Sequence, residues 1–293
     1  MQYRTLGRTG LRVSQIGFGG AVVGIPNYLE AWDPHDPGCR QTVTTALHRA
    51  LDLGLNYFDT AEGYGAGASE EIMGEVIGGR REECVVATKV SSRAPAEIRR
   101  ACEASLRRLQ TETIDVYQFH GSWYDAQDVT AILDHGGLET MQALQAEGKV
   151  RFLGFTAEAP TNEVSQLVQT GAFDVVQLRY NLMYQHACDY VNDRGVMLEA
   201  KARDMGVVAM RPLTSGTFQK LMRQAVPQLS APAVHRLLLT YVLSNPFVDV
   251  AIVGMRRAAE ADENAALCDD LDGRFDLAEL HERFVEAGEG GHC

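Results

Sequence analysis

Short apolar runs alternate with amphipathic stretches along most of the chain. In these stretches apolar residues recur three and four positions apart, as they do over 43–51, which is typical of helices with one buried face. The apolar runs have the length of buried strands, which we predict at 16–20, 55–58, 84–88, 114–119, 150–155, 174–178, 207–210 and 248–253. We predict helices at 40–53, 69–77 (capped by Ser69), 98–109, 138–146, 164–168, 193–205, 234–242, from 258, and at 276–286.

Eight strand–helix units in succession predict a (β/α)8 TIM barrel, with residues 1–293 as a single domain. Tyr3–Leu6 and Leu11–Val13 flank the turn sequence GRTG and predict an N-terminal β-hairpin. The alternative is an open doubly wound sheet. It is disfavoured because IGFGGAVVG, at the first barrel strand, lacks the GxGxxG turn of dinucleotide-binding folds. Three longer segments, 24–39, 121–137 and 211–230, are predicted to be loops.

The composition narrows the class of protein. The 293 residues carry a formal charge of −12, so a broad nucleic-acid surface, which needs a basic face, is not expected. No apolar run reaches the roughly 18 residues of a membrane span, and the start MQYRTLGRTG lacks the apolar stretch of a signal peptide. The six cysteines follow no CxxC spacing. We therefore expect a cytoplasmic protein with neither disulfides nor a metal site.

Ionisable residues stand at the ends of three consecutive predicted strands. Asp59, Lys89 and His120 follow the second, third and fourth strands, and Tyr64 lies in the turn after Asp59. In a barrel the carboxyl ends of all strands share one face, so we expect these side chains to meet there. Each has a structural interpretation, such as an ion pair, a core histidine or an ordinary tyrosine. Four buried polar groups together are costly without a function, which favours one shared site.

The sequences DTAEGYGAGASE, VATK and FHG, in this order, resemble the tetrad regions of the aldo-keto reductases. The resemblance extends from RTLGRTGLRVSQIGFGG to the helix near residue 264. It implies that Tyr64 is the acid that protonates a carbonyl oxygen during reduction. Lys89 would then lower the pKa of the phenol, Asp59 would hold Lys89 in place, and His120 would orient and polarise the carbonyl.

The resemblance also implies a nicotinamide cofactor. GFTAE stands where the family usually has Gly-x-Ser-Asn, so Thr156 keeps a hydroxyl for the carboxamide while Ala157 lacks the amide side chain. QLRYN matches the family's Gln-x-x-Tyr-Asn, which implies that Gln177 binds the nicotinamide carboxamide. Arg211 stands where many members have an aromatic residue, and a guanidinium can also stack on a flat ring. Leu213, Ser215 and Gly216 resemble the loop along the pyrophosphate.

The last predicted strand leads into GMRRAAEADENAAL. A predicted helix start at this point provides backbone donors and positive charge for a phosphate, through Gly254, Met255, Arg256 and Arg257. Arginines are otherwise unfavourable at a helix N-terminus, which favours an anionic ligand over a solvated helix end. A 2′-phosphate would use one of these arginines, so we expect NADP(H) rather than NAD(H). Glu263 and Asn264 match the family's adenine-contact pair.

We therefore expect an NADP(H)-dependent oxidoreductase that reduces a small aldehyde or ketone, with Tyr64 as proton donor. One alternative is a sugar or alcohol dehydrogenase that works in the reverse direction. Another is a nucleotide-sensing regulatory subunit that resembles the potassium-channel β subunits. A metal-dependent hydrolase is disfavoured, because the strand ends carry no His-x-His and no clustered carboxylates. The substrate is expected to face an apolar wall made by Tyr28, Trp32, Trp123, Tyr124 and Phe218.

Overall fold

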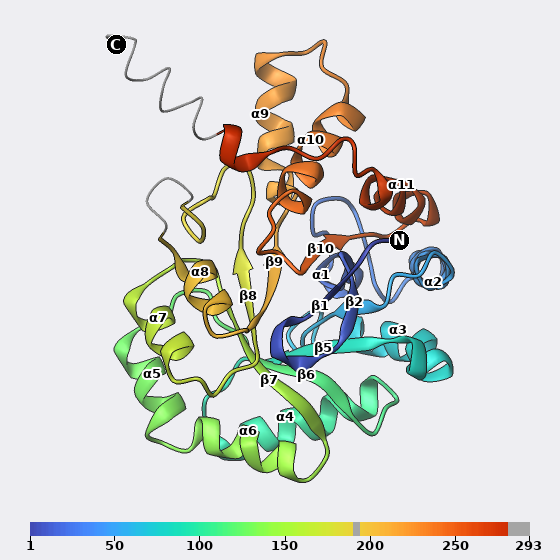
Figure 1. Ribbon diagram of the computed structural model, residues 1–293. Helices are drawn as coiled ribbons and strands as arrows, with labels where there is room; N and C mark the ends of the chain where they lie inside the picture. Colours follow the sequence, from blue (N-terminus) through green and yellow to red (C-terminus); the bar gives the residue numbers. More distant parts are fainter. Residues whose placement is uncertain (190–193, 281–293) are drawn as a thin grey trace.

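Eight parallel strands close into a barrel in a computed structural model of the chain, which describes residues 1–189 and 194–280 (Figure 1). The strands follow one another around the barrel in chain order, and the last pairs with the first through Ala251 and Ile16. The barrel strands are β3 (Ile16–Gly19), β4 (Tyr57–Asp59), β5 (Val85–Val90), β6 (Ile114–Phe119), β7 (Val150–Ala157), β8 (Val175–Arg179), β9 (Gly206–Met210) and β10 (Val250–Gly254). The predicted (β/α)8 barrel is confirmed, and the open sheet is wrong.

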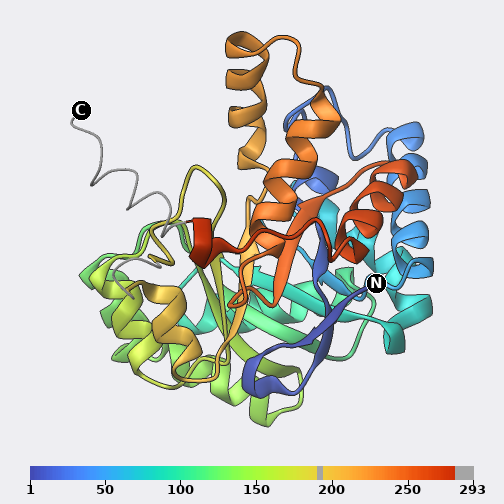
Figure 2. The same ribbon diagram turned by 45° about the horizontal axis from the view of Figure 1, so that its top comes forward.

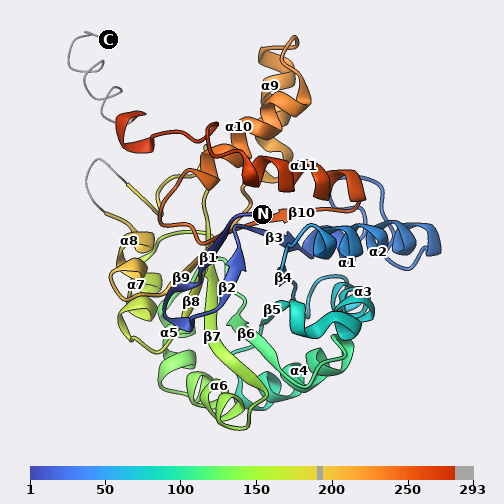
Figure 3. The ribbon, with the colours of Figure 1, turned by 45° about the vertical axis from the view of Figure 1, so that its right-hand side comes forward.

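Helices surround the barrel and cover its strands (Figure 3). They are α1 (Ala21–Gly24), α2 (Pro37–Asp52), α3 (Ala68–Ile77), α4 (Pro95–Arg108), α5 (Ala126–Leu133), α6 (Gly137–Ala146), α7 (Asn162–Gln169), α8 (Val196–Lys201), α9 (Thr217–Ala225), α10 (Ala231–Leu243) and α11 (Ala258–Asp269). The helix α4 shows why they form: Pro95 starts it, and Ile98, Ala101 and Cys102 bury one stripe. None of the helices among the described residues is long and apolar enough to cross a membrane.

Two predicted loops contain helices. The segment 121–137 holds α5, which Asp125 starts with a capping box, and 211–230 holds α9. The pattern missed α9 because none of its residues is buried, and it stands out from the barrel beside α10 (Figure 2). Ser69 is not a cap, because Gly67 takes that position and Ser69 lies inside α3. The helix predicted at 193–205 is shorter, and the one at 276–286 lies largely outside the described residues.

The predicted hairpin is confirmed, and it closes the end of the barrel at which the strands begin (Figure 1). Its strands are β1 (Tyr3–Thr5) and β2 (Arg12–Ser14), which pair antiparallel. Leu6 and Val13 are buried in the same cluster as the barrel residues Val116 and Val208. The turn passes so close to β9 that a Cβ on Gly7 would lie 2.3 Å from the nitrogen of Gly206. The hairpin therefore covers the end of the barrel at which the strands begin.

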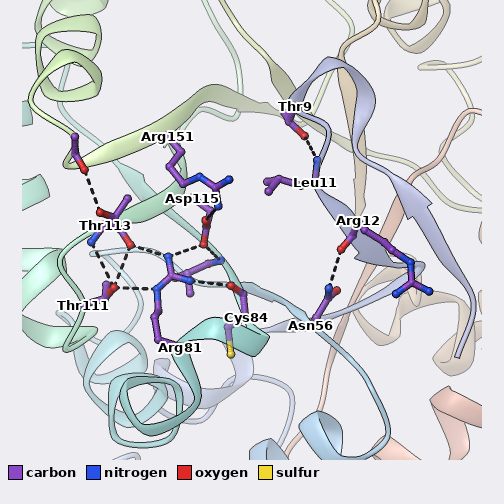
Figure 4. A network of polar contacts seen from close by, with 12 residues as sticks. Thr9, Leu11, Arg12, Asn56, Arg81, Cys84, Thr111, Thr113, Asp115 and Arg151 are labelled. Atoms are coloured by element: carbon purple, nitrogen blue, oxygen red, sulfur yellow. Dashed lines mark hydrogen bonds and ion pairs between the residues drawn. The ribbon is translucent and has the colours of Figure 1, made fainter.

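A buried carboxylate ties three strands together near the hairpin end of the barrel (Figure 4). Asp115 of β6 is 1% exposed and accepts hydrogen bonds from Arg81 at 2.7 Å, Arg151 at 2.6 Å and the backbone N–H of Val86 at 2.9 Å. Arg81 also donates to the carbonyl oxygens of Cys84 and Thr113, each at 2.8 Å. The network links β5, β6 and β7 at the end of the barrel remote from the tetrad.

We expect Asp115→Ala to lower the free energy of unfolding by about 2–4 kcal/mol, because it leaves two guanidinium groups and a buried N–H without their acceptor. Urea unfolding measures this change. Glu103→Ala is the control, since Glu103 is exposed, its partner Lys149 is only partly buried, and loss of this pair should cost no more than about 1 kcal/mol. Equal losses in the two variants would mean that the buried network adds no more than a surface ion pair.

Candidate active site

The four predicted catalytic side chains converge at the open end of the barrel. Asp59 ends β4, Lys89 lies near the end of β5, and His120 directly follows β6. The ammonium nitrogen of Lys89 lies 2.7 and 2.8 Å from the two carboxylate oxygens of Asp59 and 5.2 Å from the centre of the Tyr64 ring. The rings of Tyr64 and His120 are 5.6 Å apart and nearly perpendicular, at 81°. The spatial convergence predicted from the strand ends is therefore present.

A close packing of two backbones brings Tyr64 to this face. The turn after β4 returns toward α1, and its Gly65 has a positive φ of 65°. A Cβ at Gly65 would lie 1.9 Å from the carbonyl oxygen of Gly24, so a larger residue would push the turn outward. The N–H of Ser69, within the first turn of α3, donates to the carbonyl oxygen of Tyr64 at 3.2 Å. The turn and the helix start thus hold Tyr64 beside Lys89.

Burial and one ion pair set the pKa values of the side chains at the centre of the site. Burial alone would lower the pKa of Lys89, but the Asp59 carboxylate raises it above the usual lysine value, so the side chain is an ammonium. Burial raises the pKa of Tyr64 more than the ammonium lowers it, and Asp59 adds to the rise. Lys89 thus lowers the pKa of Tyr64 as predicted, but burial outweighs this effect and the net pKa of Tyr64 lies above the usual tyrosine value.

His120 is uncharged, unlike Lys89 and Asp59. Burial, followed by the positive charges of Lys89 and Arg93, lowers the pKa of His120 to about 3. At neutral pH the imidazole therefore carries one N–H and one free lone pair, so it can donate a hydrogen bond without adding charge. His120 is held by its backbone N–H, which donates to the carbonyl oxygen of Val90 at 2.8 Å.

A cavity of about 390 Å³ opens directly onto these side chains. Asp59, Tyr64 and His120 contribute to its lining, together with residues of β3, β7, β8, β9 and β10 and of the segments that follow β3, β6, β7 and β9. Seven of the predicted cofactor residues lie in its lining, namely Thr156, Gln177, Arg211, Leu213, Ser215, Gly216 and Gly254. The other four, Arg256, Arg257, Glu263 and Asn264, lie beyond it at the start of α11 or within that helix.

Thr156 and Gln177, the residues predicted to bind the nicotinamide carboxamide, differ in the hydrogen bonds that they already make within the protein. The hydroxyl of Thr156 donates to the carbonyl oxygen of Gly121 at 2.8 Å and accepts from its N–H at 2.9 Å, so it holds the segment after His120. Gln177 accepts from Gln118 at 3.3 Å, its amide nitrogen lies 3.7 Å from the sulfur of Met210, and its side chain also hydrogen-bonds the Asp59 carboxylate. Gln118 was missed, although a glutamine within the apolar run IDVYQF marks it.

Arg211 lies in the cavity wall, and its guanidinium is paired with Glu158. Its backbone has a positive φ of 58°, an uncommon conformation for a residue with a side chain. Glu158 also lies 3.3 Å from the guanidinium of Arg179 and is itself 11% exposed. Glu158 was not predicted as a site residue, although it directly follows β7 as Asp59 ends β4.

The two arginines of the predicted phosphate site are placed very differently. Arg256 is 4% exposed, donates to the carbonyl oxygens of Val22 at 2.7 Å and Tyr28 at 3.0 Å, and lies over the ring of Trp32. Arg257 is 52% exposed, and it caps the start of α11. Both arginines pair with Glu30, which was not predicted as a site residue.

Glu263 and Asn264, the residues predicted to contact adenine, also differ in burial. Glu263 is exposed on α11, whereas Asn264 is buried and lies 2.8 Å from the imidazole of His235 on α10. Only the side chain of Glu263 is therefore free to reach a ligand without breaking a contact in the protein.

The predicted aromatic wall is largely wrong. Of its five residues only Tyr28 lines the cavity. Trp32 is buried with its N–H bonded to Val23 at 2.8 Å, Tyr124 is buried against Phe155, and Trp123 is 66% exposed on the outside. The apolar lining comes instead partly from the segment after β3, through Val22, Ile25 and Leu29, and partly from aliphatic residues at the ends of β9 and β10. Aromatic type alone did not indicate which way each side chain points.

The chain is similar to several known proteins over most of its length. A model of the aldo/keto reductase family matches residues 15–272. Methylglyoxal reductase YeaE of Escherichia coli is 31% identical, with 84% of each chain covered. L-galactose dehydrogenase of Arabidopsis thaliana is 26% identical over 93% of this chain and 89% of its own.

A solved structure agrees with this similarity. The aldo-keto reductase of Klebsiella pneumoniae in complex with NADPH has a TM-score of 0.72 and 28% identity, and the match covers 96% of this chain and 94% of that one. The barrel, the converging strand-end residues and the family match lead to one conclusion. The chain belongs to the aldo/keto reductase family.

Proposed function

We propose that this protein is an NADP(H)-dependent reductase that converts an aldehyde or a ketone to the alcohol, with Tyr64 as the proton donor. The observation that supports this most is the meeting of Tyr64, Lys89 and His120 beside one cavity, which Tyr64 and His120 line. Family membership and the NADPH complex of a structural neighbour support the cofactor.

The residues in the cavity suit a nicotinamide cofactor, which when bound supplies the hydride. Gln177 lines the cavity, and the acceptors beside its amide are the weak sulfur of Met210 and the Asp59 carboxylate, so we assign Gln177 to the carboxamide of the nicotinamide. Gly216 has a positive φ of 78° and nothing within 4 Å of a Cβ position, which leaves open space beside Ser215 for a pyrophosphate. We assign the 2′-phosphate to Arg257, because the guanidinium of Arg256 is committed to the segment after β3.

Each residue of the tetrad then has one task. The raised pKa of Tyr64 keeps the phenol protonated at neutral pH, so it is ready to donate to an oxygen that gains negative charge. The Lys89 ammonium stabilises the phenolate that remains, and Asp59 holds Lys89 in place. The neutral His120 donates a hydrogen bond to the same oxygen and orients the carbonyl group.

The same residues serve oxidation of an alcohol, and the similarity to L-galactose dehydrogenase makes sugars a worthwhile second substrate class. The test is to mix purified protein with NADPH and a panel of aldehydes and ketones, and separately with NADP⁺ and a panel of sugars, and to follow nicotinamide absorbance. Turnover in either arm supports an enzyme. Cofactor binding without turnover in both arms would favour the nucleotide-sensing regulatory subunit instead.

We expect Tyr64→Phe to reduce kcat for carbonyl reduction by at least about 10²-fold, because the proton donor is lost while the ring remains. The affinity for NADPH, measured by fluorescence titration, should change less than about twofold, since the hydroxyl makes no cofactor contact in this proposal. Tyr184→Phe, outside the cavity lining, is the control and should keep full activity. Substantial turnover in Tyr64→Phe would contradict the role of Tyr64.

The lowered pKa of His120 makes stability depend on pH. Between its ordinary value of 6.5 and about 3, the unfolded chain takes up a proton that the folded protein does not, so acidification destabilises the fold. From pH 7 to about pH 5 we expect the wild type to lose about 1–2 kcal/mol more than His120→Asn in urea unfolding. His48→Asn, at an exposed position, should not reduce the loss. Parallel pH profiles for wild type and His120→Asn would show that His120 titrates normally.

We expect Arg257→Ala to weaken NADPH binding about tenfold and NADH binding less than about twofold, because only NADPH carries the 2′-phosphate. Isothermal titration calorimetry measures both affinities. The control is Arg100→Ala, which removes an exposed guanidinium of α4 outside the cavity lining. Equal weakening of the two nucleotides would place the 2′-phosphate elsewhere.

A further inference from the structure

One carboxylate of the segment between α1 and α2 joins both arginines of the phosphate site. Glu30 lies 3.0 Å from Arg256 and 2.9 Å from Arg257, and its second oxygen lies 3.0 Å from Arg257. These arginines hold the pKa of Glu30 below its usual value, although burial opposes them in part. The carboxylate is therefore ionised at neutral pH and already occupies the guanidinium that we assign to the 2′-phosphate.

A second carboxylate takes the backbone donors of the same site. Glu260 of α11 accepts from the N–H groups of Arg256 at 2.7 Å and Arg257 at 3.1 Å, and from the Arg257 guanidinium at 2.8 Å. Two negative side chains thus balance two positive ones, and the site has no net excess of positive charge. An anionic group must therefore compete with the chain's own carboxylates.

We propose that Glu30 competes with the 2′-phosphate of NADP(H) for Arg257, and so sets how strongly this protein prefers NADP(H) over NAD(H). This inference rests on the proposed function. A bound phosphate must either displace Glu30 from Arg257 or lie beside a like charge, and both reduce its affinity. NAD(H) carries a neutral hydroxyl at that position, so it leaves the ion pair in place.

Glu30 is easier to displace than Glu260. Glu30 is 41% exposed and lies on a segment without regular structure, whereas Glu260 lies within α11 and caps its first turn. Arg256 keeps its bonds to Val22 and Tyr28 and its stacking on Trp32 when Glu30 leaves. Val22 and Tyr28 line the cavity, so the substrate wall stays in place without Glu30.

The test is to measure the dissociation constants of NADPH and NADH by calorimetry for the wild type and Glu30→Gln. We expect NADPH to bind about tenfold more tightly to the variant, while the affinity for NADH changes less than about twofold. The matched control is Glu75→Gln. Glu75 is also exposed, at 43%, and it pairs with an arginine on a neighbouring helix, Arg40 of α2. The control should leave both constants unchanged.

The same substitution in an Arg257→Ala background separates competition from a general charge effect. If Glu30 acts through Arg257, Glu30→Gln should improve NADPH binding there by less than about twofold. An NADPH-to-NADH ratio unaffected by Glu30→Gln, or an equal gain with Arg257 absent, would overturn the inference. A wild-type protein that binds neither nucleotide would instead contradict the proposed function, so the two failures are distinguishable.

Discussion

The ion pair between Lys89 and Asp59 is the interaction on which the site depends. Both side chains are almost fully buried, and an unpaired charge in that position would cost several kcal/mol. The pair is tolerated because the ammonium makes three short contacts, two to Asp59 and one of 2.6 Å to the carbonyl oxygen of Thr60. It leaves a positive charge beside the Tyr64 ring, which is the charge that a phenolate needs.

The barrel makes this pair possible by ordering its strands. Because β4, β5 and β6 are adjacent and parallel, their last residues share one end, and Asp59 lies opposite Ala87, two residues before Lys89. The other end is closed by the hairpin and stabilised by the buried carboxylate of Asp115. Stability and chemistry are thus placed at opposite ends, and each end has its own buried carboxylate.

Acidic side chains also moderate the positive charges around the cavity. Glu158 pairs with Arg211 in the wall, and Glu30 pairs with Arg257 at the start of α11. In a protein with a formal charge of −12, carboxylates paired in this way further weaken the general attraction for anions. Recognition then depends on whether a ligand can replace a particular carboxylate, which is more selective than an uncompensated basic patch.

The barrel and the identity of the tetrad follow from the linear order of residues. Strand and helix periods are local, and a parallel barrel brings strand ends together whatever the side chains are, so Asp59, Lys89 and His120 were predictable. The direction of each loop side chain was not, because it depends on contacts made by distant segments. Trp32 lies under Arg256, 224 positions later in the chain, and Thr156 is held by Gly121. Folding likewise decided the net pKa of Tyr64 and the pairing of Glu30 with both arginines, since burial and charge balance exist only once separate segments pack together.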